Sequence, residues 1–117
     1  MTESEPLAFL PLPHLAFHVL LALADGDRHG WSIVRRIEEL TEGVWSPSAG
    51  SLYLSMVGLE KKGLIAEIAA PEGDTDARRR YYTLSNLGRR VLDLERKRLV
   101  SLVSVAANAG RRPGQSG

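Results

Sequence analysis

A helix bracketed by its own start and stop signals, between Ser48 and Gly63, constrains the fold of this chain more than any other stretch. Pro47 disfavours helical backbone at the residue before it, Ser48 is suited to cap the helix N-terminus, and Gly63 is suited to end the helix in a left-handed conformation. The sequence therefore predicts a helix of about four turns. One buried stripe is expected on it, formed by apolar residues at helical spacing: Leu52, Met56, Leu59 and, past the stop, Leu64.

The other side of this helix carries small residues, namely Gly50, Ser51, Ser55 and Gly58. A capped helix start beside small polar side chains suits close approach to DNA, with the helix N-terminus near a phosphate. The same pattern also describes an ordinary amphipathic helix with few large surface side chains. This stretch alone leaves both interpretations open.

Length and composition narrow the class of protein. The chain has 117 residues, 44% of them hydrophobic, which suits one small domain with a single core. Because it contains no cysteine, disulfides and thiolate metal sites are excluded. No apolar run reaches the roughly 18 to 20 residues of a membrane span, and the N-terminus does not resemble a secretory signal. We therefore expect a cytoplasmic protein that does not enter a membrane.

The charges are unevenly divided along the chain. Residues 1–76 contain five Lys or Arg against twelve Asp or Glu, a balance of −7, whereas residues 77–117 contain ten against two, a balance of +8. A basic segment attached to an acidic body indicates a polyanion partner. Attraction between opposite halves within a dimer is the alternative explanation.

The other elements follow from apolar periodicity and turn signals. We expect a flexible arm over residues 1–11, a helix over 12–24 with Pro13 in its first turn, and a second helix over about 29–41. A very short strand at Val44 and Trp45 precedes the capped helix. Strands over 64–70 and 78–84, joined by a polar loop, are followed by a last helix from Asn86 to about Ala107 and a flexible tail over 110–117. The apolar side of the second helix is predicted from Trp31, Val34, Ile37 and Leu40.

This order predicts a fold that is mainly α with a small β-hairpin. It is the layout of a winged helix-turn-helix over residues 12–84, followed by a dimerisation helix over 85–109. The last helix carries apolar residues near heptad spacing, and such a seam needs a partner helix, which indicates a homodimer. Glu95 and Arg98 interrupt the seam and favour a short contact. The residues expected at this contact are Leu92, Leu99, Leu102, Val103 and Ala106.

Three consecutive arginines, Arg78, Arg79 and Arg80, open the returning arm of the hairpin. If the hairpin extends as a wing, these side chains reach beyond the body towards DNA. Alternation along a strand would send Arg79 to the side opposite its two neighbours. Ion pairs with Asp74 and Asp76 are the alternative role for these arginines.

No constellation of residues indicates an enzyme. The sequence has neither a Gly-x-Ser-x-Gly elbow nor a Gly-rich phosphate loop, so we expect no catalytic residue and no cofactor. His14 and His18 are four residues apart and could share one face of a helix, a spacing that metal sites use. Because no third ligand is evident nearby, we expect packing roles for both and no metal site.

Several stretches together resemble the PadR family of bacterial transcriptional regulators. They are Leu20–Leu23, His29–Ile33, Gly50–Tyr53, Leu59–Ile65, Arg79–Ser85 and Gly88. The resemblance covers about residues 15–100, and the single helix after the wing is similar to the smaller subgroup of the family. It implies a homodimeric DNA-binding repressor that a small, commonly aromatic, ligand releases from its operator.

With this resemblance, specific residues become candidates for each role. The expected DNA contacts are Ser48, Gly50, Ser51, Tyr53, Ser55, Lys62, Arg78, Arg79 and Arg80. An effector pocket between subunits would be lined by Phe17, Leu92 and Leu99. The family usually has a basic residue where Gly58 stands, so one phosphate contact is expected to be missing here.

Two functions remain open from the sequence. The first is a sequence-specific transcriptional regulator, a ligand-responsive repressor that acts as a homodimer on a palindromic operator in double-stranded DNA. The second is a protein-interaction module that uses the winged fold without reading DNA. In that case Leu54, Val57 and Gly58 would form an apolar docking face.

Overall fold

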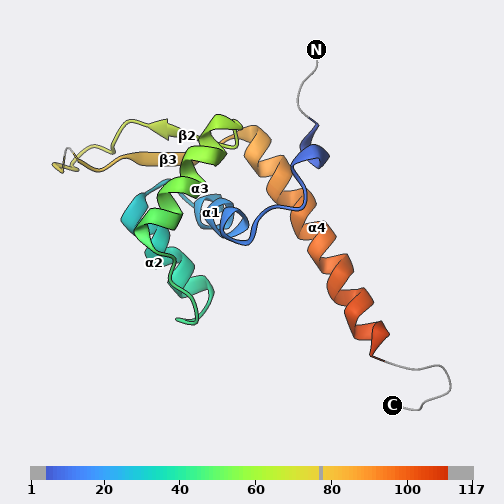
Figure 1. The fold of residues 1–117 in the computed structure, drawn as a ribbon. Helices are drawn as coiled ribbons and strands as arrows, with labels where there is room; N and C mark the ends of the chain where they lie inside the picture. The colour runs from blue at the N-terminus through green and yellow to red at the C-terminus, as the bar shows by residue number, and fades with distance from the viewer. Residues whose placement is uncertain (1–4, 77, 111–117) are drawn as a thin grey trace.

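A computed structural model describes residues 5–76 and 78–110, which form helices around a small antiparallel sheet (Figure 1). In chain order the elements are η1 (Pro6–Phe9), α1 (His14–Ala24), β1 (Arg28–His29), α2 (Gly30–Leu40), α3 (Ala49–Lys61), β2 (Ile65–Ile68), β3 (Tyr81–Leu84) and α4 (Asn86–Ala109). The predicted fold class, mainly α with a small hairpin, is confirmed. Within the described ranges, no helix has both the length and the apolar character needed to cross a bilayer.

The sheet has the order β1-β3-β2, so the returning arm of the hairpin is the central strand. The prediction of a short strand at Val44 and Trp45 is wrong, because the third strand is instead Arg28–His29. Around Trp45 the backbone is satisfied locally: its N–H donates to the Thr41 hydroxyl, and that hydroxyl also lies 3.2 Å from the Trp45 carbonyl oxygen. Since both backbone groups already have a partner, they do not need a strand.

The core lies where α1 crosses the other helices and the sheet. Val19, Leu20 and Leu23 of α1 are buried, as expected of a helix that is apolar on most sides. Helix α1 begins at His14, two residues later than predicted, so Pro13 is the N-cap residue and not part of the first turn. The remaining core side chains come from every other long element: Ile33, Val34, Ile37, Leu52, Met56, Leu59, Leu64, Ile65, Leu84 and Val91.

Of the flexible arm predicted over residues 1–11, residues 1–4 lie outside the described residues, and residues 5–11 contact the body. They include the 3₁₀ helix η1, which lies against α4 (Figure 1). Phe9 and Leu10 pack against the core. Just after this segment, the Leu12 backbone N–H donates a hydrogen bond of 2.9 Å to the Glu95 carboxylate. Apolar side chains and this one polar contact therefore hold the chain before α1 against α4.

Helix α3 has the ends that the sequence predicts. The Ser48 hydroxyl accepts a 3.1 Å hydrogen bond from the Ser51 backbone N–H, and Gly63 adopts a φ of +76°. The predicted stripe of Leu52, Met56 and Leu59 is buried. The central helix is thus fixed at both ends and along one side.

The first half of helix α4 packs against the body, and its second half is exposed. Its N-cap, Ser85, accepts a hydrogen bond from the Gly88 N–H, as predicted. Gly88, Val91 and Glu95 are buried against the body, whereas every residue from Val100 to Gly110 is exposed. The second half projects away from the body in a direction different from that of the hairpin (Figure 1). Of the predicted tail over 110–117, residues 111–117 lie outside the described residues.

Two helical glycines are expected to respond oppositely to alanine. A Cβ at Gly88 would collide with the Leu64 carbonyl oxygen and the Leu84 side chain, whereas a Cβ at Gly58 would meet nothing within 4 Å. We expect Gly88→Ala to lower the free energy of unfolding by about 2 kcal/mol through overpacking. Gly58→Ala should raise it by up to about 1 kcal/mol, because alanine is the better helix former. Urea denaturation of both variants measures the two changes in unfolding free energy. If both substitutions changed it in the same direction, this description of how Gly88 packs would be contradicted.

Candidate nucleic-acid interface

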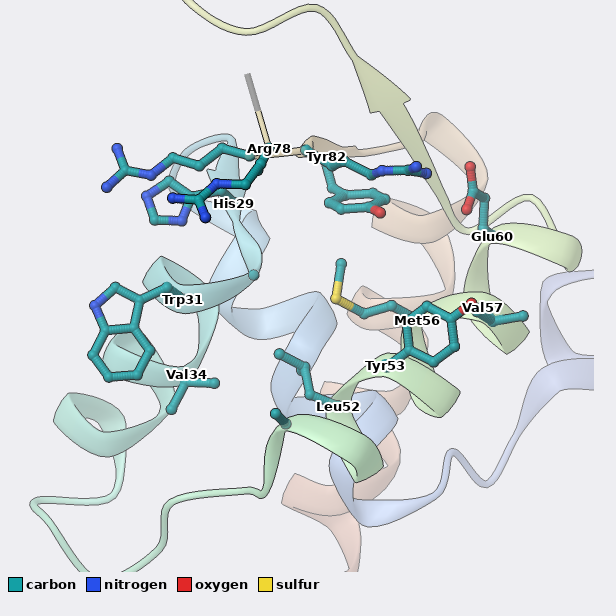
Figure 2. Close-up of a pocket in the computed structure, with 14 residues that line it drawn as sticks. His29, Trp31, Val34, Leu52, Tyr53, Met56, Val57, Glu60, Arg78 and Tyr82 are labelled. Carbon is teal, nitrogen blue, oxygen red and sulfur yellow. The ribbon is translucent and has the colours of Figure 1, made fainter. Parts of the chain in front are cut away.

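A groove of about 420 Å³ lies between α3, the start of α2 and the chain just before β3 (Figure 2). Its apolar part consists of Val34, Leu52, Met56 and Val57. Aromatic and charged side chains surround this part: His29, Trp31, Tyr53, Glu60, Arg78, Arg79, Arg80 and Tyr82. The groove therefore brings the predicted recognition helix and the predicted wing arginines together on one side of the molecule.

The three arginines do not alternate as the strand prediction required. Strand β3 begins only at Tyr81, so Arg78, Arg79 and Arg80 lie in the loop before it. The alternation of a strand therefore does not apply, and all three line the same groove, with Arg79 also bordering a neighbouring groove beside α2. The expectation that Arg79 points away from its neighbours is therefore wrong.

Acidic partners hold these arginines in weak, mostly exposed ion pairs. The closest pairs are Arg78 Nε to Asp76 at 3.3 Å, Arg79 to Asp76 at 3.7 Å and to Asp74 at 3.8 Å, and Arg80 to Glu67 at 3.8 Å. The side chains of Arg78 and Arg80 remain 93% and 71% exposed. Exposed pairs contribute little and are easily exchanged, so these arginines can release their carboxylates for another anion.

His29 joins β1, α2 and the hairpin at the edge of the groove. Its Nδ1 accepts a hydrogen bond from the Ser32 backbone N–H and so caps α2, and its ring meets the Tyr81 ring edge-on at 5.2 Å. Burial, and then the nearby Arg79 charge, lower the pKa of His29 below its ordinary value. A neutral ring is what the capping role requires, because Nδ1 must accept a hydrogen bond rather than carry a proton. Across the same loop the Tyr81 hydroxyl donates to Asp74, which anchors the loop.

The start of α3 lies beside the groove, with Ala49 in its lining and Ser48, Gly50 and Ser51 exposed. The two serines already bond to each other, because the Ser48 and Ser51 hydroxyl oxygens are 3.0 Å apart. Ser48 is further committed as the helix cap. The Ser48 hydroxyl therefore serves the helix start, whereas the Ser51 hydroxyl only accepts in this pair and keeps its proton for an external acceptor.

Two of the predicted contact residues lie on the other flank of α3. Ser55 and Lys62 line a second groove of about 330 Å³, together with Phe9 and Leu12 of the N-terminal segment. Gly58 lines it as well, so a basic side chain at this position would not face the arginine-lined groove. The structure brings Tyr53, Arg78, Arg79 and Arg80 together and leaves Ser55 and Lys62 apart from them.

Trp31 is a groove residue that its spacing in the sequence had assigned to the core. Its side chain is 64% exposed, and it stands at one edge of the groove (Figure 2). The buried side of α2 is formed by Ile33, Val34 and Ile37. A run spaced by three residues turns about 60° backwards at each step, because a full turn takes 3.6 residues. Trp31 and Leu40 therefore cannot share one face, and this geometry was the available signal.

The side of α3 opposite the core is not bare. At helical spacing it consists of Gly50, Leu54, Val57 and Lys61. Leu54 is 71% exposed and the adjacent Tyr53 is 68% exposed. Most of the small residues of α3 occupy one flank of the helix instead, and the outward face carries large apolar groups.

The histidines pair with an aromatic side chain. His14 and His18 lie 4.7 and 5.0 Å from the Trp45 ring, and the His18 ring nitrogen Nδ1 is 2.8 Å from the His14 carbonyl oxygen. Among residues 5–76 and 78–110, no three His, Cys, Asp or Glu side chains gather as metal ligands would.

Comparison with known proteins identifies relatives in sequence and in fold. The model of the transcriptional regulator PadR-like family matches residues 19–94. An uncharacterised 37.1 kDa transposon protein of Streptomyces fradiae is 36% identical over 77 residues, which cover 66% of this chain and 20% of that protein. The chain thus spans about a fifth of the length of this curated relative.

Two solved structures show the likeness in three dimensions. A PadR family transcription regulator from Clostridium difficile has a TM-score of 0.74 at 22% identity, with 85% of this chain and 100% of that chain covered. Bacillus subtilis PadR, solved in complex with operator DNA, has a TM-score of 0.60 at 25% identity, with 69% of this chain and 46% of that chain covered.

Proposed function

The chain belongs to the PadR-like family of transcriptional regulators, and from this premise we propose that it represses transcription by binding operator DNA as a homodimer. Residues 12–84 form the DNA-binding unit in this proposal, and residues 85–109 form the dimerisation helix. Helix α3 enters a major groove, and the arginine loop before β3 contacts the adjoining backbone or minor groove.

One observation carries the DNA-binding part of the proposal. Helix α3, with its exposed Tyr53, and the three arginines line one groove, and Figure 2 shows Tyr53 and Arg78 on its two sides. Phosphate is bound by arginines and by hydroxyl groups, which position a protein on the duplex. The exposed side chains of Arg78 and Arg80 are therefore suited to fix α3 on DNA.

A second copy of the chain is the partner that α4 requires. Leu102 and Val103 are 49% and 69% exposed. Leu102 continues the side of the helix that Val91 and Glu95 bury against the body, and Val103 lies on the adjoining side with Leu92 and Leu99. Beyond the body this side has no neighbour within the described chain. Two copies related by a two-fold axis would cover each other's exposed side, with Leu92, Leu99 and Ala106 in the same contact.

Release by a small aromatic effector completes the proposal. Phe17, Leu92 and Leu99 are all half-buried and lie on the two helices, α1 and α4, that a second copy would cover. An apolar cavity between the copies could take a planar aromatic compound there. Binding in it would change the relative position of the two α3 helices and hence their fit to the operator.

The test begins with selection of bound sequences from random duplex DNA. We expect a palindromic motif with half-sites about 34 Å apart, one turn of the duplex. Affinity for the selected duplex should fall steeply with salt, and Arg79→Ala/Arg80→Ala should reduce the slope of log affinity against log salt by about one for each phosphate that the variant no longer binds. Fluorescence anisotropy across a salt series measures both slopes.

Arg96→Ala is the matched control for these arginines. Arg96 is also exposed and ion-paired, with Asp93, but it lies on α4 away from the groove. Its variant should keep the wild-type slope. The protein-interaction function would be supported by a different outcome. In that case the chain would enrich no DNA sequence and retain no duplex, and it would capture a protein through Leu54 and Val57.

A further inference from the structure

If α3 reads DNA, its side chains leave few ways to distinguish bases. Strong discrimination in the major groove comes from bidentate contacts of Arg or Lys with guanine and of Asn or Gln with adenine. From Ala49 to Leu59, α3 contains none of these four residue types and no acid. Of its two serines, Ser51 accepts a hydrogen bond from the Ser48 hydroxyl at the helix start, and Ser55 lines the second groove on the flank of the helix.

Large apolar groups stand where the base-reading side chains of such a helix belong. Leu54 and Val57 lie on the side of α3 opposite the buried stripe, where Leu54 is 71% exposed and borders the second groove, and Val57 is half-buried and borders the arginine-lined groove. Gly50, one turn before Leu54, is exposed, and nothing lies within 4 Å of the place where its Cβ would be. The missing side chain lets the helix backbone come close to a base edge, so that Leu54 and Val57 reach the groove floor.

The chemistry of the groove floor identifies what these side chains can recognise. Among the four bases only thymine presents an apolar group in the major groove, its C5-methyl. The arginine loop beside α3 supplies sequence-independent attraction to the backbone, so affinity does not require polar base contacts. Burying Leu54 against a polar base edge would gain little, whereas a methyl group offers matching apolar surface.

We propose that Leu54 and Val57 determine operator specificity by contacting thymine methyl groups. This inference rests on the proposed function, and it assigns sequence reading to apolar contact rather than to hydrogen bonds. The selected operator should therefore contain thymine at the positions that α3 faces in each half-site.

Deoxyuridine provides the test, because it pairs like thymidine and lacks only the methyl group. In the selected duplex each thymine is replaced singly by uracil, and the affinity of the full chain is measured by fluorescence anisotropy. We expect affinity to fall about fourfold for each contacted methyl group that is removed. Leu54→Ala and Val57→Ala should weaken binding to the thymine duplex and abolish the further decrease on uracil substitution at the matching position.

Leu7→Ala is the matched control, because Leu7 is a comparably exposed leucine, 65%, that belongs to η1 and lines neither of the two grooves beside α3. This variant should keep the wild-type sensitivity to uracil. Equal affinity for thymine and uracil duplexes would overturn methyl reading while leaving DNA binding intact. A uracil effect of unchanged size in Leu54→Ala and Val57→Ala would also overturn it, since the effect would then arise from DNA shape. Failure to bind any duplex would overturn the proposed function itself.

Discussion

Replacing Glu95 by alanine is expected to lower the free energy of unfolding by about 3 kcal/mol, the lower end of the cost of breaking a buried ion pair. The Glu95 side chain is 2% exposed and accepts hydrogen bonds from Arg98 and from the Leu12 backbone N–H. Alanine would leave both donors without this acceptor. The lower end applies because the Arg98 side chain is 36% exposed and can regain water.

Two further variants separate burial from charge. Asp93→Ala removes an exposed carboxylate that pairs with Arg96 and Lys97 on the same helix, and it should cost less than about 1 kcal/mol. Glu95→Gln keeps an acceptor for the Leu12 N–H, so its loss of unfolding free energy should lie between the losses of Asp93→Ala and Glu95→Ala. Urea denaturation at one fixed protein concentration measures all three, since dimerisation would couple stability to concentration. Equal effects of Glu95→Ala and Asp93→Ala would contradict the role of Glu95 in holding the N-terminal segment.

The same carboxylate gives stability a defined dependence on pH. Hydrogen bonds from Arg98, supported by the Leu12 N–H, lower the pKa of Glu95 below its ordinary value of 4.5 despite its burial. A lowered folded-state pKa means that the stabilisation is fully present above pH 4.5 and is lost as pH falls through the folded-state value. Glu95→Gln should therefore lose less stability than the wild type on acidification below that pH.

Glu95 also marks the limit of what the sequence could predict. A charged residue in an apolar seam predicts an interruption of the dimer contact. In the structure it is the most buried charged side chain of the described chain, because the N-terminal segment folds over it. Its hydrogen bond to Leu12 joins residues 83 positions apart, and no local pattern could predict that pairing.

Features set by local chemistry were predictable, in contrast. Helices α3 and α4 begin at the predicted caps, Ser48 and Ser85, and α3 stops before the predicted Gly63. These ends were predictable because capping depends on a few neighbouring residues. The site was predicted less completely. The three arginines and Tyr53, which were expected to contact DNA, line one groove. Trp31 lines it as well, and the backward turn of a three-residue spacing already indicated that Trp31 leaves the buried face of α2. Ser55 and Lys62 line a different groove, because the rotation of α3 about its axis is fixed by its neighbours.

The second large effect is expected from charges placed on the free half of α4. Leu102→Asp/Val103→Asp should convert the proposed dimer to a monomer and weaken binding to a palindromic operator by more than about 100-fold, since linking two half-site contacts gains a factor of about 10² to 10⁴. Both residues are exposed in the single chain, so the monomer fold should survive. Sedimentation and operator affinity measure the two consequences.

Ser101→Asp/Ser104→Asp is the control, because it adds the same charge to the opposite side of the same helix. Lys97, Ser101, Ser104 and Asn108 recur at helical spacing and form the polar side of α4, which a partner would leave in water. This variant should stay dimeric and bind the operator as the wild type does. If both double variants dissociate alike, charge on α4 matters but the assigned contact side is wrong. If the Leu102/Val103 variant stays dimeric, the second copy docks elsewhere, and the apolar half of α4 must have another partner.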